Sequence, residues 1–367
     1  MRNLTRYYFY LLLFLGISLN PNNYSWSSTL VSNKNIRDVS QILSRKDAAA
    51  FALLAYHDEA NNPDIPDGFT LLCQCPIEMQ SKNYYGEAYY RIDYAYYSDG
   101  RKIPAGVTVV IAHRGTILTK DNLEDDLQVA LKIAPDAYFT GSKPFTNYVS
   151  SLVYSKFPYK EGFFTHHFVH VGHSLGAIHA ELNYVSQRKN EWSDNMFATT
   201  FESPGSKEIM TGLISIGELS TSSLYWASSI EIINTDVNAI NSFNEQAGII
   251  LWIRPGYHFT HIPKIDFPPT DFKYFLTAFT LDQHSMLNIY KFLKNDGQID
   301  NVGSFPVGIN NAYKYYLTYF PSLDNAHRDY WNEAFKDYWD NHSEIHAEYN
   351  NDFINYRDYE IKHHLYS

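Results

Sequence analysis

The sequence is poor in cysteine and in basic residues, and each shortage excludes a class of protein. Only 2 of the 367 residues are cysteine, so a scaffold held together by many disulfides is excluded. The chain has 29 lysine and arginine residues against 40 aspartate and glutamate residues, a net charge of −11. Nucleic-acid binding requires a basic surface that displaces counterions. We therefore expect no nucleic-acid partner and no simple electrostatic docking on anionic lipid.

Long apolar runs are also missing, with one exception near the N-terminus. Residues 7–19 (YYFYLLLFLGISL) are almost wholly apolar, follow Arg2 and Arg6, and precede the polar residues 20–23. A basic start, an apolar stretch and a polar break are the parts of a secretory signal, and a membrane-spanning helix needs about 20 apolar residues. We expect residues 1–26 to be a signal peptide and the protein to be secreted or exported to an envelope compartment. The alternative is an uncleaved anchor or a buried N-terminal helix.

Cys73 and Cys75 are separated by one residue on a predicted strand, so their side chains share one face. A disulfide across so short a loop is strained, and a zinc site needs further ligands that no second cysteine pair supplies. We expect two free thiols.

Hydrophobic residues make up 45% of the chain, which is enough for a sizeable core. The apolar patterns predict strands over residues 68–75, 86–97, 107–112, 163–171, 197–201, 229–234 and 248–253. They predict helices over residues 46–57, 121–133, 144–154, 175–188 and 271–280. Strands that alternate with helices indicate an α/β fold with a mostly parallel central sheet.

The chain changes character after residue 320. From Asp324 to the end it contains no proline and no glycine, and apolar residues recur at steps of three and four. Such spacing places them on one face of a long helix or a helical pair. We expect a main domain at residues 27–320 and an amphipathic helical extension at residues 321–367. Its apolar face either packs on the main domain or meets a partner or a lipid interface.

The most informative segment is Gly172-His173-Ser174-Leu175-Gly176, at the end of a predicted strand and the start of a predicted helix. A serine on this sharp turn presents its hydroxyl at the carboxyl end of the sheet, and glycines on either side allow strand and helix to approach closely. A serine hydroxyl also needs a histidine base that is oriented by a carboxylate. The chain order serine, acid, histidine that this fold class uses selects Ser174, Asp236 and His284.

Other residues compete for two of these roles. Asp266, Asp271 and Asp282 also precede His284, but Asp282 is only two residues away from it and Asp271 is better explained as a helix N-cap. His258 and His261 are the alternatives to His284. Several histidines surround the serine, but their spacing matches no metal-binding motif, so we expect no metal and no cofactor.

An acyl-transfer site also needs donors for the developing oxyanion. The backbone N–H of Leu175 is the first candidate because it follows the nucleophile. The second is Thr116, which ends the sequence His113-Arg114-Gly115-Thr116 after a predicted strand.

Together these motifs resemble those of the class 3 (fungal-type) lipase family, over roughly residues 45–295. Residues 109–116 (VVIAHRGT) resemble the family's strand followed by F-R-G-[ST], and residues 122–127 (NLEDDL) its N-W-x-x-D-L. Residues 172–176 are its G-H-S-L-G, and residues 200–205 (TFESPG) resemble T-F-G-x-P, with Glu202 in place of the glycine.

This resemblance implies an α/β-hydrolase fold and a Ser-Asp-His hydrolase of carboxylic lipid esters. It assigns the oxyanion hole to Thr116 and to the N–H of Leu175, with no cofactor. A phospholipase A1 or an acyltransferase on the same residues is the first alternative. A module that kept the fold but lost catalysis is the second.

Overall fold

The computed structural model describes residues 42–57, 62–80, 84–96, 102–116, 120–158, 165–188, 195–253, 268–276, 280–295, 297, 299–301, 306–319 and 325–366. The expected signal peptide, Asp266, His258 and His261 lie outside these residues. For Asp282 the structure describes the backbone but not the side chain.

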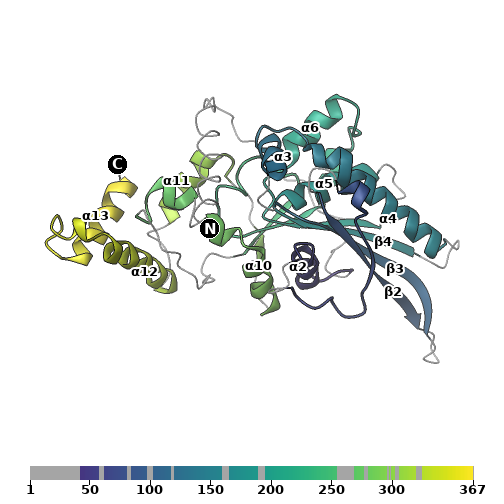
Figure 1. The fold of residues 1–367 in the computed structure, drawn as a ribbon, viewed down its shortest axis with the longest axis horizontal. Coiled ribbons are helices and arrows are strands. Elements are labelled where there is room, and N and C mark those ends of the chain that lie inside the picture. Colours follow the sequence, from purple (N-terminus) through teal and green to yellow (C-terminus); the bar gives the residue numbers. More distant parts are fainter. Residues whose placement is uncertain are drawn as a thin grey trace.

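A single eight-stranded sheet forms the centre of the molecule, with its strands in chain order (Figure 1). The strands are β1 (Thr70–Gln74), β2 (Gly86–Tyr96), β3 (Lys102–His113), β4 (Thr165–His173), β5 (Met196–Phe201), β6 (Glu231–Asn234), β7 (Ile249–Ile253) and β8 (Ile299–Asn301). Strands β3 to β7 are parallel, whereas β1, β2 and β8 run antiparallel to their neighbours. Side chains of β3 and β4 are buried on both faces, which explains their continuous apolar runs.

The helices and short turns follow in chain order. They are α2 (Arg45–Leu54), η2 (Ile77–Met79), α3 (Lys120–Ala130), η4 (Tyr138–Ser142), α4 (Lys143–Lys156), α5 (Leu175–Gln187), α6 (Lys207–Ser215), α7 (Ser223–Ala227), α8 (Phe272–Tyr274), α9 (Thr280–Gln283), α10 (Met286–Lys294), α11 (Ile309–Tyr319), α12 (Asn325–Asn341), η7 (Ser343–Ile345) and α13 (Phe353–Tyr366). Helices α4 and α5 lie on one side of the sheet, and α2 and α10 lie on the other (Figure 1). The predicted class, an α/β sheet flanked by helices, is confirmed.

The helix predicted over residues 271–280 is described only in part. Its first turn is α8, which Asp271 caps by accepting a hydrogen bond from the Lys273 N–H at 2.6 Å, and Thr280 begins α9. Helices α6, α7, α10 and α11 and strand β8 were not predicted. No described helix is both long and apolar enough to cross a membrane.

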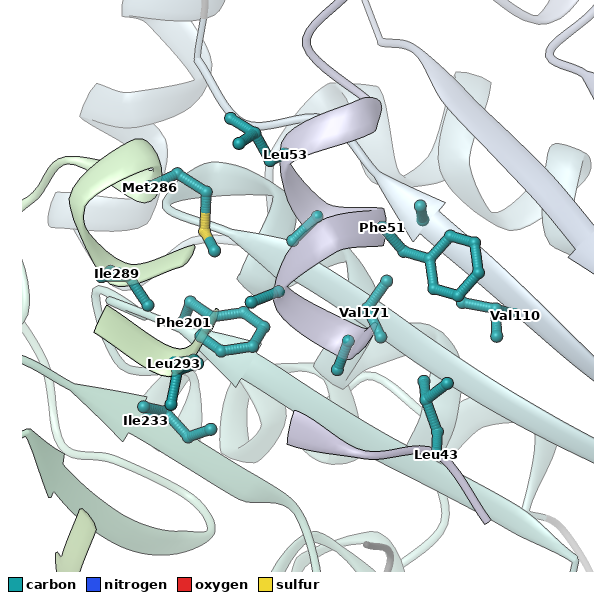
Figure 2. Packing of buried hydrophobic residues seen from close by; sticks show 14 of the residues in the cluster. Leu43, Phe51, Leu53, Val110, Val171, Phe201, Ile233, Met286, Ile289 and Leu293 are labelled. Carbon is teal, nitrogen blue, oxygen red and sulfur yellow. The ribbon is translucent and has the colours of Figure 1, made fainter. Parts of the chain in front are cut away.

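The main core lies between the sheet and the pair α2 and α10. Figure 2 shows Phe51 of α2 near Val110 and Val171 of the sheet, and Met286 and Ile289 of α10 near Phe201 of β5. Ala48, Ala49 and Ala52 of α2 are fully buried, so this helix presents small side chains that let it approach the sheet closely. The packing holds in place the chain just beyond the C-cap of α2 and just before the N-cap of α10, and both segments belong to the site described below.

The extension forms a second apolar cluster with the main domain. Its buried residues are Val237, Ala239, Tyr274, Phe275, Leu276, Ala312, Tyr316, Ala334, Phe335, Trp339 and Tyr356. Val237 and Ala239 follow β6, Tyr274 ends α8, Phe275 and Leu276 come next, and the others belong to α11, α12 and α13. Both cysteines are free, with Cys75 buried and Cys73 half-buried, and burial raises the pKa of Cys73 to about 11.

Candidate active site

Ser174 sits on a strained turn between β4 and α5. Its φ is +60° and its ψ is −129°, a conformation that non-glycine residues rarely adopt. The predicted role of the two glycines is confirmed. A Cβ on Gly172 would lie 2.1 Å from the Gly176 carbonyl oxygen, and one on Gly176 would lie 2.2 Å from the His113 carbonyl oxygen. The turn exists because both positions lack side chains.

His284 contacts a carboxylate, but the carboxylate belongs to Glu202. Nδ1 of His284 lies 3.3 Å from Oε2 of Glu202, and the residues are 9% and 0% exposed. A carboxylate accepts hydrogen bonds, so we assign the proton to Nδ1 and the lone pair to Nε2. Nε2 is buried and has no hydrogen-bond partner among the described residues. This is the state that a general base requires before it takes a proton.

Glu202 is held in place by donors that come from the segment after β6. Oε1 accepts the backbone N–H of Thr235, and Oε2 accepts the side-chain amide of Asn238 at 2.6 Å. The amide of Asn241 lies 3.2 Å from the same oxygen. Glu202 follows β5 directly and has a φ of +49°. Among the described residues, all hydrogen-bond partners of this carboxylate are N–H groups, so both of its oxygens accept.

Asp236, the acid predicted from the sequence, lies in the same cluster but makes different contacts. Its Oδ1 accepts the N–H of Val237 at 3.0 Å, and its carbonyl oxygen accepts the amides of Asn238 and Asn241. Burial, reinforced by the neighbouring Glu202 charge, raises the pKa of Asp236 to about 7. Among the described residues, no hydrogen bond or ion pair joins the Asp236 carboxylate to His284. Sequence reasoning missed Glu202, although a carboxylate directly after a strand was a visible signal.

The two predicted oxyanion donors lie on adjacent pieces of chain. Leu175 is the first residue of α5, where backbone N–H groups have no partner within the helix. The loop after β3 touches the start of this helix, because a Cβ on Gly176 would lie 2.8 Å from the carbonyl carbon of Arg114. Thr116 follows in that loop, and its Oγ1 donates to Oδ1 of Asp126 on α3 at 2.8 Å. Burial raises the pKa of Asp126 to about 7.

A chain of buried side chains runs beneath the site. The hydroxyl of Tyr84 lies 2.8 Å from Nδ1 of His113, and Nε2 of His113 lies 3.3 Å from Nδ1 of His170. Nε2 of His170 lies 3.0 Å from Oε1 of Gln187, which can only accept. All links are satisfied when Tyr84 donates into the chain and both imidazoles are neutral. Burial lowers the pKa of His170 to about 4 and that of His113 well below its usual value.

No group of histidine, cysteine, aspartate and glutamate side chains in the described part of the chain is arranged to hold a metal ion. His113 and His170 are hydrogen-bonded to each other and stacked, with their rings 14° from parallel.

The buried His170 makes a specific prediction for acid stability. Its folded pKa of about 4 lies below the usual 6.5, so the unfolded chain binds its proton first and stability is lost as the pH falls from about 6.5 to about 4. His170→Gln removes this loss, although it also removes a hydrogen bond. The destabilisation by His170→Gln is expected to be about 2 kcal/mol smaller at pH 5 than at pH 7.5, as measured by urea unfolding. Parallel pH curves for the two proteins would contradict the assignment.

The chain has matches among solved structures but none among sequence families. No protein-family model matches the chain, and no curated protein sequence matches it significantly. The native Rhizomucor miehei lipase propeptide complex aligns with 59% of this chain and 70% of its own, at 13% identity and a TM-score of 0.35. Lipase II from Rhizopus niveus aligns with 60% of this chain and 83% of its own, at 12% identity and a TM-score of 0.36.

A triacylglycerol lipase from Penicillium expansum aligns with 59% of this chain and 81% of its own, at 13% identity and a TM-score of 0.35. The chain is thus distantly similar in structure to these fungal lipases, over about 60% of its length.

Proposed function

We propose that the protein is a serine hydrolase of carboxylic esters that works through an acyl-enzyme, with Ser174 as nucleophile and His284 as base. The observation that carries the proposal is the buried contact between Nδ1 of His284 and Glu202, beside the strained turn of Ser174. We assign Glu202 as the acid that orients the base. A neutral imidazole with its proton on Nδ1 leaves Nε2 available for the serine proton.

The reaction follows from these positions. The Oγ atom of Ser174 attacks the ester carbonyl carbon while Nε2 of His284 takes its proton. The Leu175 N–H and Thr116 stabilise the oxyanion that forms. The tetrahedral intermediate then expels the alcohol, which receives the proton from His284. A water molecule, deprotonated by the same nitrogen, hydrolyses the acyl-enzyme and restores Ser174.

Within this class we propose lipid esters as substrates, because the order of the motifs resembles that of class 3 lipases. We also propose export through residues 1–26. Phospholipids, neutral lipids and acceptor alcohols tested side by side would separate a lipase from a phospholipase A1 and from an acyltransferase.

Labelling with a fluorophosphonate probe is the direct test. The probe phosphonylates a serine only when a neighbouring base activates it, so we expect one adduct, and peptide mass spectrometry should place it on Ser174. Ser174→Ala is the control and should carry no label. A folded wild-type protein that remains unlabelled contradicts the proposal and favours a binding module that has lost catalysis.

A further inference from the structure

His173, the residue before the nucleophile, joins three parts of the site. Its Nδ1 lies 2.7 Å from the hydroxyl of Tyr56, and its Nε2 lies 2.8 Å from the carbonyl oxygen of His284. The rings of His173 and His284 are 4.6 Å apart between centroids and inclined by 40°. His173 is only 5% exposed. It therefore holds the backbone of His284 and covers part of its ring at the same time.

The hydrogen bonds define the protonation state of His173. A carbonyl oxygen can only accept, so Nε2 of His173 carries the proton and donates it to His284. Nδ1 is then the acceptor for the Tyr56 hydroxyl. Burial, and next the proximity of His284, hold the pKa of His173 well below its usual value. The neighbour of the proposed base is thus a neutral ring with a fixed tautomer.

The packing of two helices holds the residues on both sides of His173 in place. Tyr56 comes directly after Ala55, the C-cap of α2, and His284 directly precedes Ser285, the N-cap of α10. Helices α2 and α10 pack side by side over the same face of the sheet, as Leu53 and Met286 show in Figure 2. The two ends that meet at His173 are therefore anchored in the main core.

The loop after β3, which contains Gly115, packs against the same contact. A Cβ on Gly115 would lie 2.1 Å from the Tyr56 hydroxyl and 2.4 Å from the His173 carbonyl oxygen. Only glycine allows the loop to approach this closely. The loop after β3, the nucleophile turn and the proposed base thus share one buried junction.

We propose that His173, held by Tyr56, is a positioning residue that fixes the His284 imidazole over the nucleophile turn and shields one face of that ring from water. The inference rests on the proposed function of Ser174 and His284. Three groups face the junction from the surrounding elements: Tyr56 after α2, Arg114 in the loop after β3, and Glu202 on the far side of His284.

Three variants test the inference on a soluble p-nitrophenyl ester. His173→Ala should lower kcat about 100-fold with KM changed less than about twofold, because the base is displaced while the binding surface remains. It should also move the acid limb of the kcat/KM profile to higher pH by about half a unit, since water then reaches the His284 ring and favours its charged form. His173→Gln keeps an N–H near the carbonyl and should recover about tenfold of the lost kcat. Tyr56→Phe should lower kcat about tenfold.

His166 provides a matched control on the same strand. Its Nε2 lies 2.7 Å from the carbonyl oxygen of Phe157, which is the same type of link at the other end of β4. His166→Ala should leave the pH profile in place and kcat within about twofold, whatever it costs in stability.

The outcomes separate the two proposals. An inactive, unlabelled wild type overturns the hydrolase assignment itself. A labelled, active wild type with His173→Ala equal to it in kcat and in pH profile overturns only the role of His173. If His173→Ala fails to fold, imidazole ¹⁵N NMR on the wild type and on Tyr56→Phe decides. We expect a neutral His173 with the proton on Nε2 from pH 5 to pH 8, and a proton on Nδ1 or a cation at pH 7 contradicts the inference.

Discussion

Replacing Glu202 with glutamine is expected to lower kcat for ester hydrolysis about 10⁴-fold. The described partners of this side chain are all donors, so an amide NH₂ group has to face one of them. If it faces His284, Nδ1 must become the acceptor and the ring proton moves to Nε2. His284 then has no lone pair directed at the serine proton. The measurement is kcat on a p-nitrophenyl ester, with folding checked by circular dichroism.

Two further substitutions make this result specific. Asp236→Asn is the matched control because its carboxylate belongs to the same cluster but bonds to the Val237 N–H instead of His284. We expect its kcat to stay within about threefold of wild type. Glu202→Asp keeps the charge on a shorter side chain and should retain more activity than Glu202→Gln. The opposite ranking, with Asp236→Asn inactive and Glu202→Gln active, restores the acid predicted from the sequence.

The sequence could locate the nucleophile but could not choose between the two acids. Gly172 and Gly176 surround Ser174 within five residues, so the pattern that shapes the turn is local. Glu202 and Asp236, in contrast, follow the neighbouring parallel strands β5 and β6, whose carboxyl ends meet at one edge of the sheet. Both positions are therefore plausible from strand order alone.

The choice depends on contacts that join distant segments. Asn238 and Asn241 direct their amides to the Glu202 carboxylate but reach Asp236 only at its backbone carbonyl. The turn at Glu202 also has a φ of +49°, which nothing in the local sequence predicts because the residue is not glycine. Tertiary packing, and not local pattern, places Glu202 beside His284.

The same distinction explains the errors in the fold. The parallel strands were predicted well because strands buried on both faces must be continuously apolar. Strand β8 is only three residues long and pairs with β7 alone, which leaves little pattern to detect. At the end of the predicted helix over residues 271–280, Thr280 begins α9. Its hydroxyl donates to the Phe275 carbonyl at 2.6 Å and accepts the Ala239 N–H at 3.1 Å, so it ties the start of α9 to the loop after β6.

That loop connects the C-terminal extension to the proposed site. Val237 and Ala239 are buried in the cluster that also contains Phe335, Trp339 and Tyr356 of α12 and α13. Asn238 lies between them and bonds to Glu202. Successive residues of one short segment thus belong to the apolar cluster that the extension also joins, and hold the acid. Of the two interpretations that the sequence left open for the apolar face, packing on the main domain accounts for these residues.

Truncating Phe335 to alanine is therefore expected to lower the free energy of unfolding by about 3–5 kcal/mol, because its ring is 1% exposed and leaves a cavity. Well below the thermal transition, the fluorophosphonate should also label Ser174 more slowly, since loss of packing around Val237 loosens the segment that holds Glu202. Ile354→Ala on α13 is the control, because Ile354 is 50% exposed and should change stability by less than about 0.5 kcal/mol. A destabilised Phe335→Ala that labels at the wild-type rate would show that the extension stabilises the fold without supporting the site.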